Sequence, residues 1–152
     1  MLIVLSNDQI SNKSILLYSE ICNANRFLSD AAMNHIKCFG LNLSEFAVLE
    51  LLFHKGDQPM QQIGKKILIS SGNMTYVLDK LESKNYIKRF PCPKDRRVIY
   101  AVLTEEGLKL IKNIFPSHEE MIDELFSQLN RTEKEMLIYL LKKIGLKHEV
   151  QK

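Results

Sequence analysis

The chain has 152 residues, of which 45% are hydrophobic and 26% are charged, and its 21 basic side chains exceed its 18 acidic ones by 3. This composition is typical of one ordinary globular domain. The longest apolar runs, residues 98–103 and 136–141, are six residues each, far below the roughly 20 that a membrane-spanning helix needs, which excludes a transmembrane protein.

A long first helix is predicted over residues 10–38. Inward positions recur there at alternating spacings of four and three, which is typical of a helix with one narrow buried stripe. The positions on the stripe are Ile10, Ser14, Leu17, Ile21, Ala24, Leu28, Ala31 and His35. Such a stripe is closer to a coiled-coil seam than to a globular face, so we expect a second helix to cover it.

Three short helices are predicted next. Gly40 can end the first helix, and Asn42 or Ser44 can begin a second that Lys55-Gly56-Asp57 closes. Pro59 suits the first turn of a third helix. The buried positions of these two helices are Phe46, Leu49, Leu52 and Phe53, then Met60, Ile63 and Ile67. After a turn at residues 69–72, Ser70 or Ser71 can cap a fourth helix that runs to about Lys84.

A β-hairpin with a basic tip is predicted beyond these helices. Residues 86–90 and 98–103 are rich in β-branched and aromatic side chains and flank a loop with two prolines. Thr104 then begins a helix with Glu105 and Glu106 in its first turn, where the helix dipole favours acidic groups. Its apolar seam reaches Leu129, and Pro116 inside it predicts a kink.

One more helix completes the chain, capped by Asn130 or Thr132 and ending at Gly145. Charge is unevenly distributed over these elements. Residues 60–97 hold 9 basic and 3 acidic side chains, whereas residues 1–59 hold 4 and 6, and residues 104–152 hold 8 and 9. A basic segment between faintly acidic arms predicts a polyanionic partner.

Short helix, turn, second helix and basic hairpin together predict a mainly α protein with a winged helix-turn-helix. A helix of this kind fits the major groove of DNA with its N-terminal side chains on base edges, and arginine at a hairpin tip suits the minor groove. The candidate DNA-contacting residues are Ser70, Ser71, Asn73, Thr75, Tyr76 and Lys80 on the second helix, Lys65 and Lys66 before the turn, and Asp95, Arg96 and Arg97 on the hairpin. Asp79 is interpreted as a structural ion-pair partner, and Lys88 and Arg89 are open between a surface role and phosphate contact.

The sequence resembles the MarR-type transcription regulators over nearly its whole length. Asp95-Arg96-Arg97 followed by residues 103–107 (LTEEG) is similar to the family's D-x-R and L-T-x-x-G pattern, and residues 75–82 (TYVLDKLE) resemble its T-R-x-V-D-R-L-E. Tyr76 departs from the usual arginine, and Asn85 stands where glycine commonly ends the helix, although asparagine also tolerates a left-handed conformation. Residues 71–77 look more like the MhqR-like branch, which represses quinone and aromatic-compound detoxification genes.

The resemblance implies one domain over residues 1–152, with a DNA-binding region at 44–103 and dimerisation helices at 1–40 and 104–152. It implies that Arg97 is the minor-groove arginine, that Asp95 holds it, and that a small-molecule pocket lies between the two regions. The long apolar seams of the outer helices independently favour a homodimer. We therefore expect a repressor that binds a palindromic double-stranded DNA operator and is released by a small aromatic or quinone-like effector.

Two alternatives remain. A thiol-based redox-sensing repressor would use Cys22, Cys38 or Cys92, whose odd number and wide spacing fit neither a disulfide scaffold nor a CxxC metal site. An architectural protein would bind DNA without sequence preference. No phosphate loop or catalytic constellation is present, so we expect no enzyme, cofactor or metal. The apolar start at residues 1–5 lacks the features of a secretory signal, so we expect a cytoplasmic protein with no membrane partner.

Overall fold

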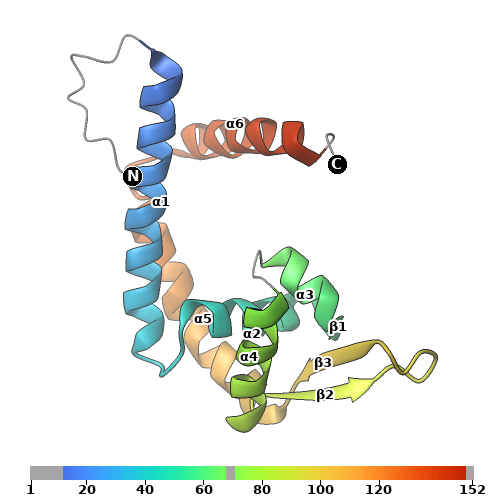
Figure 1. The fold of residues 1–152 in the computed structure, drawn as a ribbon. Helices are drawn as coiled ribbons and strands as arrows, with labels where there is room; N and C mark the ends of the chain where they lie inside the picture. The colour runs from blue at the N-terminus through green and yellow to red at the C-terminus, as the bar shows by residue number, and fades with distance from the viewer. Residues whose placement is uncertain (1–11, 68–70, 150–152) are drawn as a thin grey trace. The chain divides into compact units, whose positions relative to one another are not determined.

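The computed structural model describes residues 12–67 and 71–149 (Figure 1). These residues form six helices and one three-stranded antiparallel sheet, which bears out the predicted mainly α fold with a winged helix-turn-helix. The elements in chain order are α1 (Lys13–Lys37), α2 (Leu43–Lys55), β1 (Gln58–Pro59), α3 (Met60–Lys66), α4 (Ser71–Ser83), β2 (Ile87–Pro91), β3 (Ile99–Leu103), α5 (Glu105–Leu125) and α6 (Arg131–Glu149). None of the described helices is long and apolar enough to cross a bilayer.

The corner between α1 and α2 is built by the residues that the sequence indicated. Gly40 takes a left-handed φ of 71°, which costs glycine little because it has no Cβ. Asn42 and Glu45 then form a reciprocal capping box: the Asn42 Oδ1 accepts from the Glu45 N–H at 2.8 Å, and the Glu45 Oε2 accepts from the Asn42 N–H at 2.9 Å. Gly56, at φ 70°, ends α2 as predicted.

The sheet contains one strand more than the predicted hairpin. Its order is β1-β3-β2, with Gln58 opposite Ala101 and Ile87 opposite Leu103. Pro59 was predicted in the first turn of a helix, but it lies in β1 and is the N-cap of α3. A strand of two residues is too short to show an alternating pattern, so its existence depends on pairing with β3.

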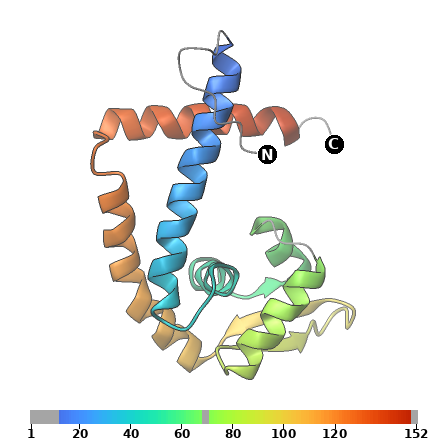
Figure 2. The ribbon, with the colours of Figure 1, turned by 60° about the vertical axis from the view of Figure 1, so that its left-hand side comes forward.

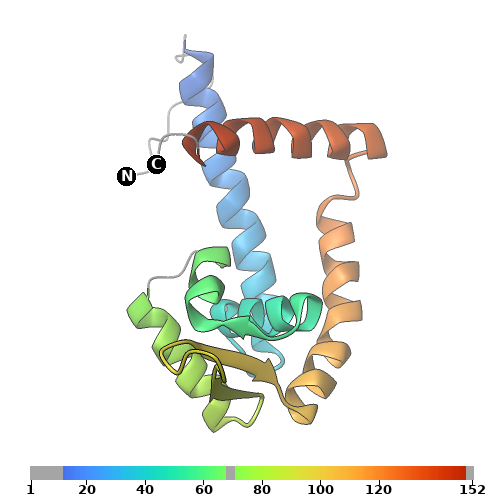
Figure 3. The ribbon, with the colours of Figure 1, turned by 90° about the vertical axis from the view of Figure 1, so that its right-hand side faces the viewer.

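α2 lies at the centre of the winged helix, where it contacts α1, α4 and β3 (Figure 2). Behind this packing is a single buried core: Ile36, Leu41, Phe46, Val48, Leu49, Leu52, Ile63, Met74, Val77, Leu78, Leu81, Ile87, Ala101, Ile111 and Ile114. Because α5 contributes Ile111 and Ile114 to this core, its first half is fixed to the winged helix rather than separate from it (Figure 3).

The chain forms two compact units that divide after His118, and the second comprises residues 119–152. The structure agrees with one prediction for this unit and differs from two others. Asn130 caps α6 as expected, with its Oδ1 accepting from the Glu133 N–H at 3.0 Å. The seam was predicted to stay helical to Leu129, but α5 ends at Leu125 and turns follow.

The predicted end of the last helix at Gly145 was wrong. α6 continues to Glu149 because glycine within a helix costs only about 1 kcal/mol relative to alanine and does not by itself stop it. α5 continues through Pro116 without interruption, and the kink there stays a prediction.

Candidate nucleic-acid interface

α4 presents one apolar and one polar side. The buried side recurs every three or four residues and comprises Met74, Val77, Leu78 and Leu81. The residues that lie between these positions face the opposite side and are exposed. The exposed set comprises Asn73, Thr75, Tyr76, Asp79 and Lys80. Four of the predicted contact residues, Asn73, Thr75, Tyr76 and Lys80, therefore lie together on the accessible side of one helix. Ser71 is the first residue of α4, and Ser70 lies outside the described residues.

Tyr76 and Lys80 form a pair one helical turn apart. The Lys80 Nζ lies 5.0 Å from the centroid of the Tyr76 ring, within the range of a cation–π interaction. Hydrogen bonding to Tyr76 raises the pKa of Lys80 above its usual value. Tyr76 is 58% exposed, so its ring stands on the surface of α4 beside a lysine that stays charged.

The C-terminal end of α4 is attached to α2 and α5. Asn85 takes a left-handed φ of 59°, as the resemblance suggested for the residue in the glycine position. The Lys84 Nζ donates to the Gly40 carbonyl and to the Glu45 Oε1, both at 3.1 Å. Glu45 is only 2% exposed, so its charge is matched where water has little access.

Thr104 and Gly107 explain the second half of the wing motif. The Thr104 hydroxyl donates to the Asn85 carbonyl at 2.6 Å and accepts from the Gly107 N–H at 3.0 Å. A Cβ on Gly107 would lie 2.0 Å from the Tyr86 carbonyl oxygen, a distance no real contact shows. The motif therefore joins the start of α5 to the end of α4.

The wing loop between β2 and β3 extends away from the helices (Figure 1), and Asp95 and Arg97 are paired on it. The Asp95 Oδ1 accepts from the Arg97 N–H and Nε at 3.1 Å, and its Oδ2 accepts from Nη2 at 3.2 Å. These hydrogen bonds with Arg97 hold the pKa of Asp95 below its usual value. Arg97 is nevertheless 91% exposed, so its guanidinium is oriented but accessible. Arg96 beside it is also exposed.

Arg89, which the sequence left open, connects the wing to α4. Its Nη2 lies 2.7 Å from the Asp79 Oδ1 and 2.5 Å from the Glu82 Oε2, and its Nε donates to the same Glu82 oxygen at 2.9 Å. The interpretation of Asp79 as a structural ion-pair partner is therefore confirmed. Hydrogen bonding with Arg89 lowers the pKa of Glu82, and Glu82 raises that of Arg89.

The signal that could have identified this role of Arg89 is a pair of carboxylates, Asp79 and Glu82, three residues apart on one helix. Among the remaining basic candidates, Lys65 and Lys66 are exposed near the end of α3. The Lys66 Nζ donates to the Gln58 Oε1 at 2.7 Å and so links α3 to β1.

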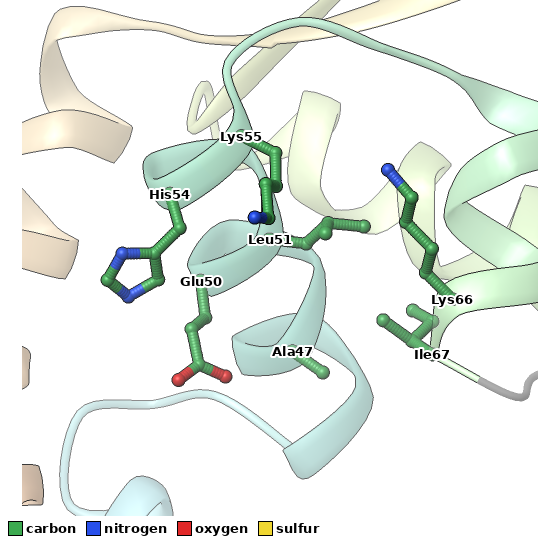
Figure 4. A pocket seen from close by; sticks show the side chains of 7 residues that line it. All are labelled: Ala47, Glu50, Leu51, His54, Lys55, Lys66 and Ile67. Atoms are coloured by element: carbon green, nitrogen blue, oxygen red, sulfur yellow. The ribbon is translucent and has the colours of Figure 1, made fainter.

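An open pocket of about 500 Å³ lies between α2 and the end of α3 (Figure 4). Ala47, Leu51 and Ile67 supply its apolar surface. In Figure 4, Leu51 and Lys55 on α2 face Lys66 and Ile67 across the opening. Its remaining polar residues are Glu50 and His54. The resemblance implied a pocket between residues 44–103 and the outer helices, whereas this pocket lies within residues 44–103. Its residues come from two helices and share no spacing pattern, so sequence reasoning did not identify it.

The three cysteines are free thiols in different settings. Cys38 is exposed just after α1, where its Sγ lies 3.5 Å from the Asn34 carbonyl oxygen, whereas Cys22 and Cys92 are half-buried. Interaction with Cys22 raises the pKa of Tyr18, which lies one turn earlier on α1. No pair among the three forms a disulfide.

Comparison with known proteins identifies clear relatives. Residues 41–99 match the model of the MarR family. The HTH-type transcriptional regulator MhqR of Bacillus subtilis is 50% identical over 137 residues, covering 90% of this chain and 94% of the relative.

Two solved structures resemble the fold closely. AbsC, a MarR family transcriptional regulator from Streptomyces coelicolor, superposes with a TM-score of 0.85 at 23% identity over 94% of this chain and 98% of its own. A mutant MarR of Escherichia coli complexed with operator DNA superposes with a TM-score of 0.80 at 25% identity, covering 90% and 98%.

Proposed function

This chain belongs to the MarR family of DNA-binding transcriptional regulators, and from that premise we propose that it is a repressor that binds a palindromic operator as a homodimer. An aromatic or quinone-like effector releases it. The observation that carries the proposal is the combination of a polar, exposed α4 surface with an arginine held at the tip of the adjoining wing. Because the relatives are transcriptional regulators, we interpret this combination as a binding surface rather than an active site.

In the proposed complex, α4 and the wing contact different grooves of the DNA. α4 enters the major groove, where Asn73, Thr75 and Tyr76 meet base edges, while Lys80 and the α3 lysines contact phosphate. The wing places Arg97 in the neighbouring minor groove, with Arg96 over the backbone. Ser70 and Ser71 are proposed to contact DNA because they stand, in the sequence, just before and at the first turn of α4.

A second copy of the chain is the proposed cover for the outer helices. On α6, seven large apolar side chains are between 40% and 60% exposed: Met136, Leu137, Ile138, Tyr139, Leu140, Leu141 and Ile144. On α1, Ile15, Leu17, Tyr18 and Phe27 are exposed as well. An apolar surface of this extent commonly marks a protein interface. In a two-fold dimer the recognition helices would meet half-sites about 34 Å apart.

The effector class is proposed from the resemblance to the quinone-responsive branch and from the pocket between α2 and α3. Its apolar surface suits a planar ring, and Lys55 and Lys66 at its edge suit a phenolate oxygen. Lys66 also holds Gln58 of β1, so a ligand that competes for its ammonium group would disturb the packing of α3. Release requires that the effector bind the DNA-incompetent state more tightly than the other.

The test begins with selection of bound DNA from a random pool. A repressor should prefer its selected palindrome over random DNA by roughly 10³-fold or more. Equal affinity for both would instead indicate an architectural protein. Arg97→Ala should weaken binding to the palindrome markedly while the dimer stays intact, and unchanged affinity in a salt titration would remove Arg97 from the interface.

Release is tested separately with quinones, phenols and thiol oxidants added to the preformed complex. A variant with all three cysteines changed to serine should still release DNA when a phenol is added. If that variant responds to none of the compounds while the natural protein does, release depends on a thiol, and the redox-sensing alternative replaces the pocket.

A further inference from the structure

Tyr76 lies at the centre of the accessible side of α4. Successive residues of an α-helix are rotated by roughly 100°, so Tyr76 points almost directly away from the side that Met74, Leu78 and Leu81 bury in the core. Its neighbours on the exposed side carry an amide at Asn73 and a hydroxyl at Thr75. Among the exposed side chains of α4 that the structure describes, Tyr76 is the one with a large apolar surface.

Lys80 restricts the orientation of this ring. Its ammonium group lies 5.0 Å from the ring centroid, within the range at which a cation–π interaction attracts a lysine to the face of a tyrosine ring. A ring that is already oriented loses less conformational entropy on binding than a free one. The pair therefore offers a preorganised apolar surface with a positive charge beside it.

We infer that Tyr76 is a specificity-determining residue that packs against the C5-methyl group of a thymine in the major groove, and that Lys80 positions its ring. Among the base edges exposed in the major groove, the thymine methyl is the one apolar group, and apolar side chains are its usual partners. The inference rests on the proposed function, since it names the base feature that α4 reads within an operator.

The decisive probe is the operator in which deoxyuridine replaces single thymines. This replacement removes the methyl group and leaves both hydrogen-bonding edges of the base pair unchanged. When deoxyuridine replaces the contacted thymine in one half-site, the natural protein should bind about fourfold more weakly, the factor that corresponds to one buried methyl group. With both half-sites replaced, the loss should be about fifteenfold if the two contributions add.

Three variants separate the contributions of the ring and the lysine. Tyr76→Ala should bind the thymine and deoxyuridine operators equally, at a lower affinity than the natural protein. Tyr76→Phe should keep most of the discrimination, because the ring is retained. Lys80→Met should lose part of the discrimination as well as some salt dependence, whereas Lys65→Met, the matched control on α3, should reduce only the salt dependence.

Several results would overturn the inference. One is a natural protein that binds every deoxyuridine operator as tightly as its thymine counterpart. Another is loss of discrimination in Tyr76→Phe, which would mean that the hydroxyl reads a hydrogen-bonding edge. Discrimination kept fully in Lys80→Met would remove the positioning role of Lys80. If selection returns no preferred sequence, the proposed function fails and the inference fails with it; a selected operator that is insensitive to deoxyuridine overturns the inference alone.

Discussion

Gly107 illustrates how a single residue determines the junction between the end of α4 and α5. Its Cα approaches the Tyr86 carbonyl so closely that an added Cβ would lie 2.0 Å from the oxygen and 2.9 Å from the carbonyl carbon. Both contacts are with backbone, which cannot move aside as a flexible side chain would. We predict that Gly107→Ala destabilises the protein by about 3 kcal/mol, at the upper end of the cost of overpacking.

Gly145 on α6 is the matched control for Gly107→Ala, because a Cβ there meets nothing within 4 Å. Gly145→Ala should stabilise the protein by up to about 1 kcal/mol through helix propensity alone. Urea unfolding measures both changes. A Gly107→Ala variant as stable as the natural protein would show that the junction is not as tightly packed as the backbone distances indicate.

Asp95 shows a different residue-scale effect, on orientation rather than stability. Its partner Arg97 is 91% exposed, and exposed ion pairs contribute little to folding. We predict that Asp95→Asn leaves the unfolding midpoint unchanged but weakens operator binding by about threefold to tenfold. The weakening reflects the conformational entropy that the freed Arg97 side chain would lose when it becomes ordered on DNA.

The pH dependence of the Asp95 effect follows from the sign of its pKa shift. Arg97 lowers the pKa of Asp95. The carboxylate is therefore charged at any pH above its ordinary pKa and is protonated only as the pH falls through the lowered pKa. Asp95→Asn should therefore weaken binding by the same factor at pH 5.5 and pH 8. Asp123→Asn on α5 is the control. A factor that shrinks between these two pH values would contradict the assigned interaction.

At the scale of single elements, the capping residues were predictable and the pairing was not. Gly40, Asn42 and Gly56 fix the ends of α1 and α2 through local backbone chemistry, which sequence records directly. β1 and the contact of Lys84 with Glu45 depend on residues 39 or more positions apart, and no local pattern encodes them. Arg89 is an intermediate case: the two carboxylates on one helix were visible in the sequence, but the packing of β2 that brings Arg89 to them was not.

The attachment of the wing to α4 provides the element-scale prediction. Arg89 donates to Glu82 and pairs with Asp79. We predict that Glu82→Gln destabilises the protein by about 1 to 2 kcal/mol at pH 7, less than a buried charged hydrogen bond would contribute, because Glu82 is 38% exposed. Asp79→Asn should have a smaller effect, since Asp79 is 56% exposed.

Acid should remove the difference between the natural protein and Glu82→Gln. Arg89 lowers the pKa of Glu82 from its ordinary 4.5. A carboxylate whose pKa is lowered on folding stabilises the folded state at any pH above its ordinary pKa. This contribution is lost as the pH falls through the lowered pKa. Unfolding midpoints of the two proteins should thus differ at pH 6 to 8 and converge as the pH falls through the lowered pKa of Glu82. A difference that persists in acid would have another cause.

At the scale of the whole molecule, the central basic segment and the apolar outer helices were both visible in the sequence, but for different reasons. The segregation of charge is found by counting basic and acidic residues along the sequence. The narrow seams over residues 10–38 and 104–129 predicted helices whose partner lay outside the chain, and Leu17 on the first seam is exposed. α6, for which no seam was predicted, also carries large apolar side chains that are exposed. The resemblance implied a pocket at the border of residues 44–103 with the outer helices, but the pocket between α2 and α3 lies elsewhere, because Leu51 and Ile67 meet only once these two helices have packed.

Dimerisation is tested by placing a charge on the exposed apolar surface of α6. Leu140, 45% exposed, sits among apolar neighbours, so Leu140→Glu should cost little in a folded monomer but should oppose an interface that buries it. We predict a monomer in sedimentation equilibrium and a loss of operator affinity of more than tenfold, because a single chain presents one recognition helix instead of two. Lys142→Glu on the same helix is the control, since its position is already polar, and it should leave the dimer intact. A Leu140→Glu protein that stays dimeric and binds the operator as tightly as before would place the interface away from α6.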